Sequence, residues 1–278
     1  MTGNLPSRPI GQFYPAQGGM QTPADVAVVM PTFGRPTIER AMESIYAQDH
    51  AGTIQIMVGI DAHDTDSQAL IRATAERRPP NVSVMVVDMG YSTAKRRGGV
   101  HLNPYNGSLR AILGYMANSE LVAFLDDDNR WEPDHVSSLL SVIPGYGWAF
   151  STRYFFDKPS GLSLCSDCWD SVGPHMGDAE GAVDGFVDPN CIMFNKVSLP
   201  AALTAWLNPL SSSGPADRRF YLWLVTRASV AWTGRETVGY GIMPRFHLWP
   251  KIMDQMRLDG TWEHKSRHLR HVEEVWVA

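Results

Sequence analysis

Runs of apolar, β-branched residues alternate with amphipathic helical patterns along the first half of the chain, and this order constrains the fold most strongly. Four such runs are predicted strands, at residues 25–33, 54–61, 82–88 and 121–128. A helical pattern separates each run from the next, which is typical of a parallel sheet covered by helices. A further strand is predicted at 148–157. We therefore expect an α/β fold with a mostly parallel central sheet flanked by helices.

Composition and charge narrow the class of protein. The 278 residues are enough for a sizeable core, and 44% hydrophobic with 19% charged residues is usual for a globular chain. The formal net charge of -5 provides no basic field for nucleic acid, and no specific nucleic-acid signal is present. Three cysteines without regular spacing suit a reducing compartment. Because no run approaches the roughly 20 apolar residues of a membrane span, we expect a cytoplasmic protein.

Polar side chains follow the predicted strands at the points where the strands end. They are Thr32, Asp61, Asp88 and the acidic residues 126–128. In open α/β sheets, ligands bind beyond the carboxyl ends of the strands. The sequence therefore predicts several oxygen ligands on one rim of the sheet.

Three adjacent carboxylates, Asp126, Asp127 and Asp128, close the fourth run. If the strand continues through them, Asp126 and Asp128 point to one side and Asp127 to the other. Two carboxylates on one side suit Mg²⁺ or Mn²⁺, which is often shared with a diphosphate. The alternative is a solvated turn whose Asp side chains cap nearby backbone. The run lacks the Gly and Glu of an EF-hand loop.

Three motifs occur in a fixed order in the segments VAVVMPTFGRPTIERAMESIYAQDH and LVAFLDDDNRWEPDHV and between them. They are Pro-Thr-aromatic-x-Arg-Pro at 31–36, a strand-ending Asp at Asp61, and Asp-x-Asp at Asp126 and Asp128. With these motifs the chain resembles the family 2 glycosyltransferases, which have the GT-A fold. The resemblance covers roughly residues 25–250.

The resemblance implies a division of the chain into functional parts. A Rossmann-like nucleotide-sugar half is expected at 25–130, and an acceptor half with the catalytic helix at 131–250. A flexible arm at 1–24 precedes them, and a helical extension at 251–278 follows.

The resemblance also implies roles for individual side chains. The expected nucleotide-sugar-binding residues are Pro31, Thr32, Phe33, Arg35, Asp61, Arg110, Asp126 and Asp127. In such proteins the end of the first strand cradles the nucleotide, and the second-strand carboxylate accepts a hydrogen bond from the base, commonly uracil. Arg110 matches an Arg that the family places before its metal motif, and a guanidinium that faces the diphosphate or braces Asp126 is chemically sensible there. Asp61 could instead cap a turn, and Arg110 could be a surface helix residue.

The expected catalytic base is Asp217, at a predicted helix start. The family has Glu-Asp at this place; here Ala216 replaces the Glu, and Asp217 keeps the Asp position. A carboxylate can take the proton of an attacking hydroxyl, although an Asp in a first helical turn also stabilises a helix without catalysis. The resemblance further implies Mn²⁺ or Mg²⁺ held by Asp126, Asp128 and His247. His247 could equally be a packed or surface residue.

The connection at residues 91–107 is longer and more basic than is usual in the family. Its Lys95, Arg96 and Arg97 could hold phosphate groups of a donor or acceptor. Three neighbouring charges are more often a solvated basic turn, and that interpretation is favoured.

The cysteines raise the question of a structural zinc site. Cys165 and Cys168 form a C-x-x-C pair, with His175 and Cys191 downstream. A zinc site is conceivable, but the spacing matches no common finger or ribbon. Reduced thiols in a loop are the favoured interpretation.

The C-terminal residues 256–278 are a predicted amphipathic helix with Leu269, Val272 and Trp276 on one face. Basic and His residues between 264 and 271 could bring this helix to an anionic membrane or a lipid-linked acceptor, so peripheral membrane association is one expectation. Packing against the domain or against a second subunit, as in a homodimer, is the alternative.

The resulting hypothesis is an inverting, metal-dependent glycosyltransferase of the hexosyltransferase type. It would move a sugar from a nucleoside-diphosphate sugar to a saccharide, lipid-linked or other hydroxyl acceptor. UDP is the expected nucleotide, with GDP and dTDP left open. One alternative is a sugar-nucleotide nucleotidyltransferase, which should carry a Gly-rich basic loop after the first strand, whereas PTFGRPT has one Gly. The other is a non-catalytic sugar- or nucleotide-binding relative, which needs no base.

Overall fold

A computed structural model describes residues 11–17, 22–61, 66–102, 106–178, 185–207 and 216–269. The strands are β1 (Gly11–Tyr14), β2 (Val26–Thr32), β3 (Ile54–Ile60), β4 (Val82–Asp88), β5 (Leu121–Phe124), β6 (Arg130–Trp131), β7 (Trp148–Asp157), β8 (Ser163–Ser166), β9 (Gly173–Pro174), β10 (Gly185–Phe186), β11 (Ile192–Asn195) and β12 (Val230–Ile242). The α-helices are α1 (Ile38–Tyr46), α2 (Asp66–Glu76), α3 (Gly107–Met116), α4 (His135–Val142), α5 (Ala216–Val225), α6 (Trp249–Leu258) and α7 (Trp262–Lys265). Short 3₁₀ turns are η1 (Lys95–Arg97), η2 (Pro189–Cys191), η3 (Ala202–Leu207) and η4 (Ser266–His268).

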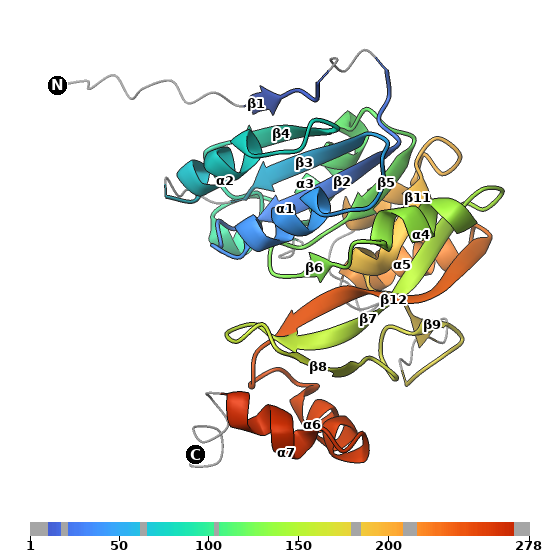
Figure 1. Cartoon of the computed structure of the whole chain (residues 1–278). Coiled ribbons are helices and arrows are strands. Elements are labelled where there is room, and N and C mark those ends of the chain that lie inside the picture. The colour runs from blue at the N-terminus through green and yellow to red at the C-terminus, as the bar shows by residue number, and fades with distance from the viewer. Residues whose placement is uncertain are drawn as a thin grey trace.

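One mixed sheet organises these elements, in the order β1-β4-β3-β2-β5-β11-β7-β12-β6, with β8 paired to β7. The neighbours β4, β3, β2 and β5 are parallel, as are β7 and β12. Strand β11 is antiparallel to both of its neighbours. Helices α1 and α2 pack side by side on one face, and α3 contacts β2 and β3 on the other (Figure 1). The prediction of a mostly parallel sheet flanked by helices is confirmed.

The N-terminal arm predicted at 1–24 is not flexible throughout. Residues 11–14 form β1, which pairs antiparallel with β4 and continues the sheet at its edge. The unpaired backbone groups of an edge strand accept such an added strand, whatever its side chains. The buried Tyr14 and the cation–π contact of Arg78, 5.6 Å from its ring centroid, anchor the strand. The first ten residues lie outside the described part of the chain.

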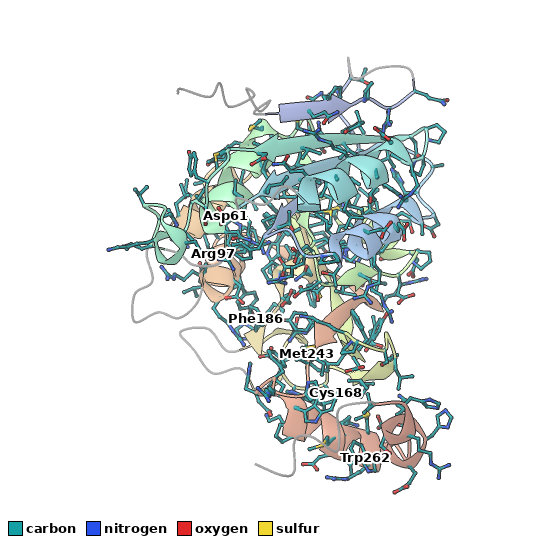
Figure 2. The ribbon with its side chains drawn as sticks, turned by 90° about the vertical axis from the view of Figure 1, so that its left-hand side faces the viewer. Asp61, Arg97, Cys168, Phe186, Met243 and Trp262 are labelled. Carbon is teal, nitrogen blue, oxygen red and sulfur yellow. The ribbon has the colours of Figure 1, made fainter. Side chains whose placement is uncertain are left out.

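The C-terminal helices form a second, smaller hydrophobic cluster with β7 and β8. Ile252 and Met256 of α6 are fully buried there beside Phe155, and Leu269 is also buried in it. Figure 2 shows Trp262 of this region at the end of the molecule far from Asp61. The single long helix predicted at 256–278 is therefore wrong up to residue 269, because two short helices pack against the domain instead.

Residues 270–278, with Val272 and Trp276, lie outside the described part. Within the described residues, no helix is both long and apolar enough to cross a membrane. Peripheral membrane association and a homodimer both stay predictions.

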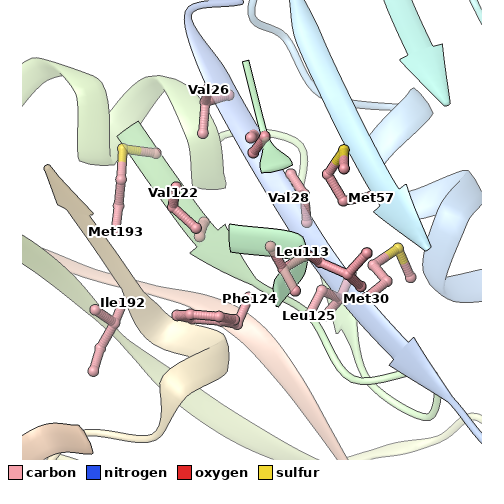
Figure 3. Packing of buried hydrophobic residues seen from close by; sticks show 14 of the residues in the cluster. Val26, Val28, Met30, Met57, Leu113, Val122, Phe124, Leu125, Ile192 and Met193 are labelled. Atoms are coloured by element: carbon pink, nitrogen blue, oxygen red, sulfur yellow. The ribbon is translucent and has the colours of Figure 1, made fainter. Parts of the chain in front are cut away.

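The main core lies on both faces of β2 and β3, all of whose residues are buried. Burial from both sides explains why these strands are continuous apolar runs. Met30, Leu113 and Phe124 lie in this core (Figure 3). Gly59 of β3 lets α3 approach the sheet, because a Cβ there would lie 2.6 Å from Cδ1 of Leu113. This packing sets the height of α3 above the carboxyl ends of the strands.

Candidate active site

A cavity of about 490 Å³ lies beyond the carboxyl ends of β2 and β5. Both predicted halves of the chain contribute to its walls. The predicted residues that line it are Pro31, Phe33, Arg35, Arg110, Asp126, Asp127, Asp128, Asp217 and His247. Thr32 and Asp61 are buried just behind the wall, and the Asp61 backbone N–H donates to the Thr32 carbonyl at 2.8 Å. Asp88 lies outside the lining and caps the following turn by accepting from the Gly90 N–H at 2.8 Å.

The acidic residues 126–128 form a turn rather than the end of a strand. Strand β5 stops at Phe124, and the Asn129 N–H donates to the Asp126 carbonyl at 3.1 Å. The prediction that Asp127 points away from Asp126 and Asp128 is therefore wrong, since strand alternation does not apply in a turn. All three carboxylates line the cavity.

Asp126 is held by Arg110 and Asn190. The Arg110 guanidinium donates to the Asp126 carboxylate, and the Asn190 amide donates to its Oδ2 at 3.1 Å. Burial acts to raise the pKa of Asp126, but Arg110 and Asn190 outweigh it and keep the pKa below its ordinary value. Arg110 is itself buried, and its Nε and Nη1 have no partner among the described residues. It is thus not a surface helix residue.

Asp127 and Asp128 are also paired with basic or hydroxyl groups. The Thr32 hydroxyl donates to Oδ2 of Asp127 at 2.6 Å, and Arg35 donates to its Oδ1 at 3.1 Å. Arg35 and Lys158 both donate to Oδ2 of Asp128, Lys158 at 2.6 Å. Burial nevertheless raises the pKa of Asp127 to about 6. Basic side chains from three separate segments therefore surround the acidic turn.

An aromatic cluster fixes the distance between this turn and α5. Phe124 precedes the turn, and Phe220 lies one helical turn after Asp217; their ring centroids are 5.3 Å apart. The Trp206 ring stacks on Phe220 at 4.8 Å and meets Phe124 edge-on at 5.3 Å. Such buried aromatic contacts are rigid, so Asp217 keeps its place opposite the acidic turn.

Asp217 lies in the first turn of α5 and is half-buried. Its Oδ1 accepts the backbone N–H of Arg218 at 2.8 Å. Burial raises the pKa of Asp217 above its ordinary value, with a smaller lowering effect from Arg218 and Arg110 and a raising effect from Asp126. Pro215, the predicted helix start, lies just outside the described residues.

The end of the cavity at Phe33 carries a contact that the sequence did not reveal. The guanidinium of Arg97 lies 3.7 Å from the centroid of Phe33, so the basic turn favoured as merely solvated covers a cavity-lining ring. Asp61 accepts the Thr93 N–H at 2.5 Å through Oδ1, while its buried Oδ2 has no partner among the described residues. Asp61 and Arg97 lie on the same side of the molecule in Figure 2.

A buried ion network closes the opposite wall of the cavity. Arg153 of β7 donates to Asp167 at 2.8 Å, to Asp170 at 2.7 Å and to Asp188 at 2.6 Å. Asp170 also accepts from Arg218 at 2.6 Å, which ties the network to α5. Burial raises the pKa of Asp188 to about 6, although Arg153 acts in the opposite direction. None of these residues had a sequence signal, because their partners are distant in the chain.

Comparison with known proteins identifies structures with a similar fold. No protein-family model and no curated protein sequence matches the chain. Among solved structures, residues 1–349 of TarS from S. aureus in complex with UDP-GlcNAc match with a TM-score of 0.55 and 14% identity, over 88% of this chain and 70% of that chain. The mannosyltransferase PcManGT from Pyrobaculum calidifontis, in complex with GDP-Man and Mn²⁺, matches with a TM-score of 0.54 and 15% identity, over 88% and 66%. The chain has the GT-A fold.

Within this GT-A fold, the predicted metal ligands are only loosely grouped. Asp126, Asp128 and His247 line one cavity, but the described residues hold no cluster of three or more His, Cys, Asp or Glu side chains close enough to bind a metal. Cys165, Cys168 and Cys191 are free thiols, and no zinc cluster exists in the described part of the chain.

The carboxylates that line the cavity outnumber its guanidinium groups. Six carboxylates line it, those of Asp126, Asp127, Asp128, Asp170, Asp188 and Asp217. Four guanidinium groups oppose them, those of Arg35, Arg110, Arg153 and Arg218. Oxygen-rich sites of this kind take Mg²⁺ or Mn²⁺.

Proposed function

We propose that this protein is an inverting glycosyltransferase that moves a sugar from a nucleoside-diphosphate sugar, with UDP as the expected nucleotide, to an acceptor hydroxyl. The observation that carries the proposal is the placement of Asp217 in the same cavity as Arg110 and Asp126, at the carboxyl edge of the parallel sheet. The GT-A neighbours in complex with UDP-GlcNAc and with GDP-Man support a sugar-nucleotide donor.

The donor would lie along the wall formed by β2, β3 and α3. Phe33 and Arg97 provide a stacked aromatic–guanidinium surface for a base, and the free Oδ2 of Asp61 can accept an N–H such as that of uracil. Arg110 lines the cavity, and its Nε and Nη1 groups are buried donors without a partner among the described residues. A diphosphate supplies the acceptors that these groups lack.

A divalent cation is part of the proposal. The candidate ligands are Asp126, Asp128 and His247, and the excess of carboxylates in the cavity favours it. When bound, Mn²⁺ or Mg²⁺ would neutralise charge on the departing diphosphate. The Mn²⁺ in the complex of the mannosyltransferase neighbour is consistent with this assignment.

Asp217 would act as the general base. The acceptor oxygen attacks the anomeric carbon, the bond from that carbon to the diphosphate oxygen breaks, and the acceptor proton moves to the Asp217 carboxylate. Oδ1 of Asp217 already accepts the Arg218 N–H, which leaves Oδ2 for this proton. A pKa raised by burial makes the carboxylate a stronger base than an exposed Asp. One displacement of this kind inverts the anomeric centre.

Nucleotide binding tests the donor half of the proposal. UDP with Mn²⁺ is expected to raise the melting temperature by several degrees, since a ligand at roughly 100 times its Kd stabilises a fold by 2.7 kcal/mol or so. GDP and dTDP with Mn²⁺ are the comparison, followed by a screen of the matching sugar nucleotides for hydrolysis. If no nucleoside diphosphate stabilises the protein, the proposed function is wrong.

Asp61 provides a sharper test of base recognition. In Asp61→Asn the amide oxygen can still accept the Thr93 N–H, while an NH₂ group replaces the free Oδ2. Because two donors then face each other, the affinity for UDP should fall by about 5- to 150-fold, equivalent to about 1–3 kcal/mol. Calorimetric titration of UDP measures this, and the melting temperature without ligand should change little. Equal UDP affinity in both proteins would show that Asp61 only caps its turn.

A further inference from the structure

Asp128 differs from the other carboxylates of the cavity because a lysine already occupies it. Nζ of Lys158 donates to Oδ2 of Asp128 at 2.6 Å, and Arg35 donates to the same oxygen. The Lys158 side chain is 25% exposed and that of Asp128 17% exposed, so the pair is shielded from bulk water. The oxygen that a metal ion would use is thus already occupied by two cationic groups.

The backbone is shaped to admit this lysine. Lys158 follows β7 directly, and its N–H donates to the Ile242 carbonyl at 3.0 Å. Gly241 lies beneath its stem, since a Cβ there would come within 2.8 Å of Lys158 Cε and 2.5 Å of the Asp128 carbonyl oxygen. Any side chain at position 241 would collide with the stem. The contact between Lys158 and Asp128 therefore depends on the absence of a side chain at position 241.

Arg40 is a further cation close to the same carboxylate. Arg40 interacts electrostatically with both Asp128 and Arg130, and its Nε and Nη2 are buried without a partner among the described residues. Arg40 and Arg130 lie over the ring of Phe156, at 4.8 and 4.4 Å from its centroid. A divalent ion bound to Asp128 would be repelled by this cationic surround and by Lys158.

We propose that Lys158 is an internal counter-ion that holds Asp128 in the metal-free protein and competes with the divalent cation for this carboxylate. Metal binding then requires the ammonium group to leave Oδ2. Lys158 in this role is a positioning residue that sets the metal concentration the site needs. The inference rests on the proposed metal role of Asp128.

The test is Mn²⁺ binding to the full chain without substrate, measured by loss of the electron paramagnetic resonance signal of free Mn²⁺. Lys158→Met keeps the stem over Gly241 and removes the charge. Removing one unit charge about 5 Å from a divalent ion is expected to tighten Mn²⁺ binding about tenfold, even with the dielectric constant of water. Lys158→Arg keeps the charge and should show no gain. Adding Asp128→Asn to Lys158→Met should abolish the gain.

Lys251→Met is the matched control, because Lys251 forms an exposed ion pair with Asp178 at 2.8 Å and does not line the cavity. It changes the net charge equally and should leave Mn²⁺ affinity as it is. Unchanged or weaker Mn²⁺ binding by Lys158→Met, or no Mn²⁺ binding by any variant, overturns the inference.

Titration with UDP in the absence of metal distinguishes failure of this inference from failure of the proposed function. If the wild-type protein binds UDP, the proposed donor site is supported even when the inference fails. A loss of metal-free UDP binding in Lys158→Met without a gain in Mn²⁺ affinity would assign Lys158 to the diphosphate instead.

Discussion

Replacement of Asp217 by Asn is expected to lower the turnover number of sugar transfer by about 100- to 10,000-fold, the range that a positioned general base contributes. The amide cannot take the proton of the acceptor hydroxyl, yet it keeps the size of the carboxylate and can accept the Arg218 N–H through its oxygen. UDP binding should therefore persist. Turnover is measured with the sugar nucleotide selected by the stabilisation screen, and binding by calorimetry.

The pH dependence of the wild-type protein belongs to the same test. Because burial raises the pKa of Asp217 above 3.8, activity should fall with acidification at a pH higher than that value. Asp254→Asn, on the exposed face of α6, removes a carboxylate that pairs with Arg257 outside the cavity and should leave the turnover number unchanged. A rate for Asp217→Asn equal to that of the wild type would show that Asp217 stabilises its helix and that the base lies elsewhere.

Loss of Arg153 is expected to have the largest effect on stability. Arg153→Met leaves Asp167, Asp170 and Asp188 without the buried guanidinium that pairs with all three. Removing one partner of a buried ion pair typically costs about 3–5 kcal/mol, because the remaining charge is left without compensation. The free energy of unfolding by urea measures the loss. Arg257→Met breaks an exposed pair instead, for which a cost of about 1 kcal/mol or less is expected.

Acid should soften this penalty. Asp188 has a folded-state pKa of about 6, above its ordinary 3.8, so its protonated form favours the folded state. Without Arg153, which lowers this pKa, the carboxyl holds its proton to still higher pH. The stability difference between Arg153→Met and the wild type should thus be smaller at pH 5 than at pH 7.5. A difference that grows on acidification would mean that the buried charges are not its cause.

The apolar runs and helical patterns of the sequence predict the buried strands of the sheet. The strands at β2, β3, β4 and β7 are buried apolar runs, and their order with the helices is enough to indicate a parallel sheet. The composition indicates the acidic cluster, but the prediction that it continues the strand is wrong. The Asn129 N–H donates to the Asp126 carbonyl, and this turn follows the early end of β5. Strand β1 forms because β4 has a free edge with which it can pair, and the sequence of residues 11–14 alone cannot show this.

The sequence indicates the cavity-lining residues that follow strand ends, but it does not indicate the contacts between distant segments. Asp217 and the acidic turn line one cavity, and aromatic packing between Phe124 and Phe220 joins the elements that carry them. Arg97 over Phe33 and Lys158 at Asp128 are contacts between segments far apart in the sequence. No periodicity or spacing encodes such contacts, since they arise only when the sheet and its helices have packed.

The close approach of α3 to β3 at Gly59 has a consequence for donor binding. Leu109 and Leu113 of this helix fit over the bare Cα, with 3.3 and 2.6 Å between their nearest atoms and the place of a Cβ. The neighbouring Arg110 reaches Asp126 from the same helix. A methyl group added at position 59 would overlap Cδ1 of Leu113, so this side chain or the helix that carries Arg110 would have to shift. The packing of the helix that carries Arg110 thus depends on the absence of a side chain at position 59.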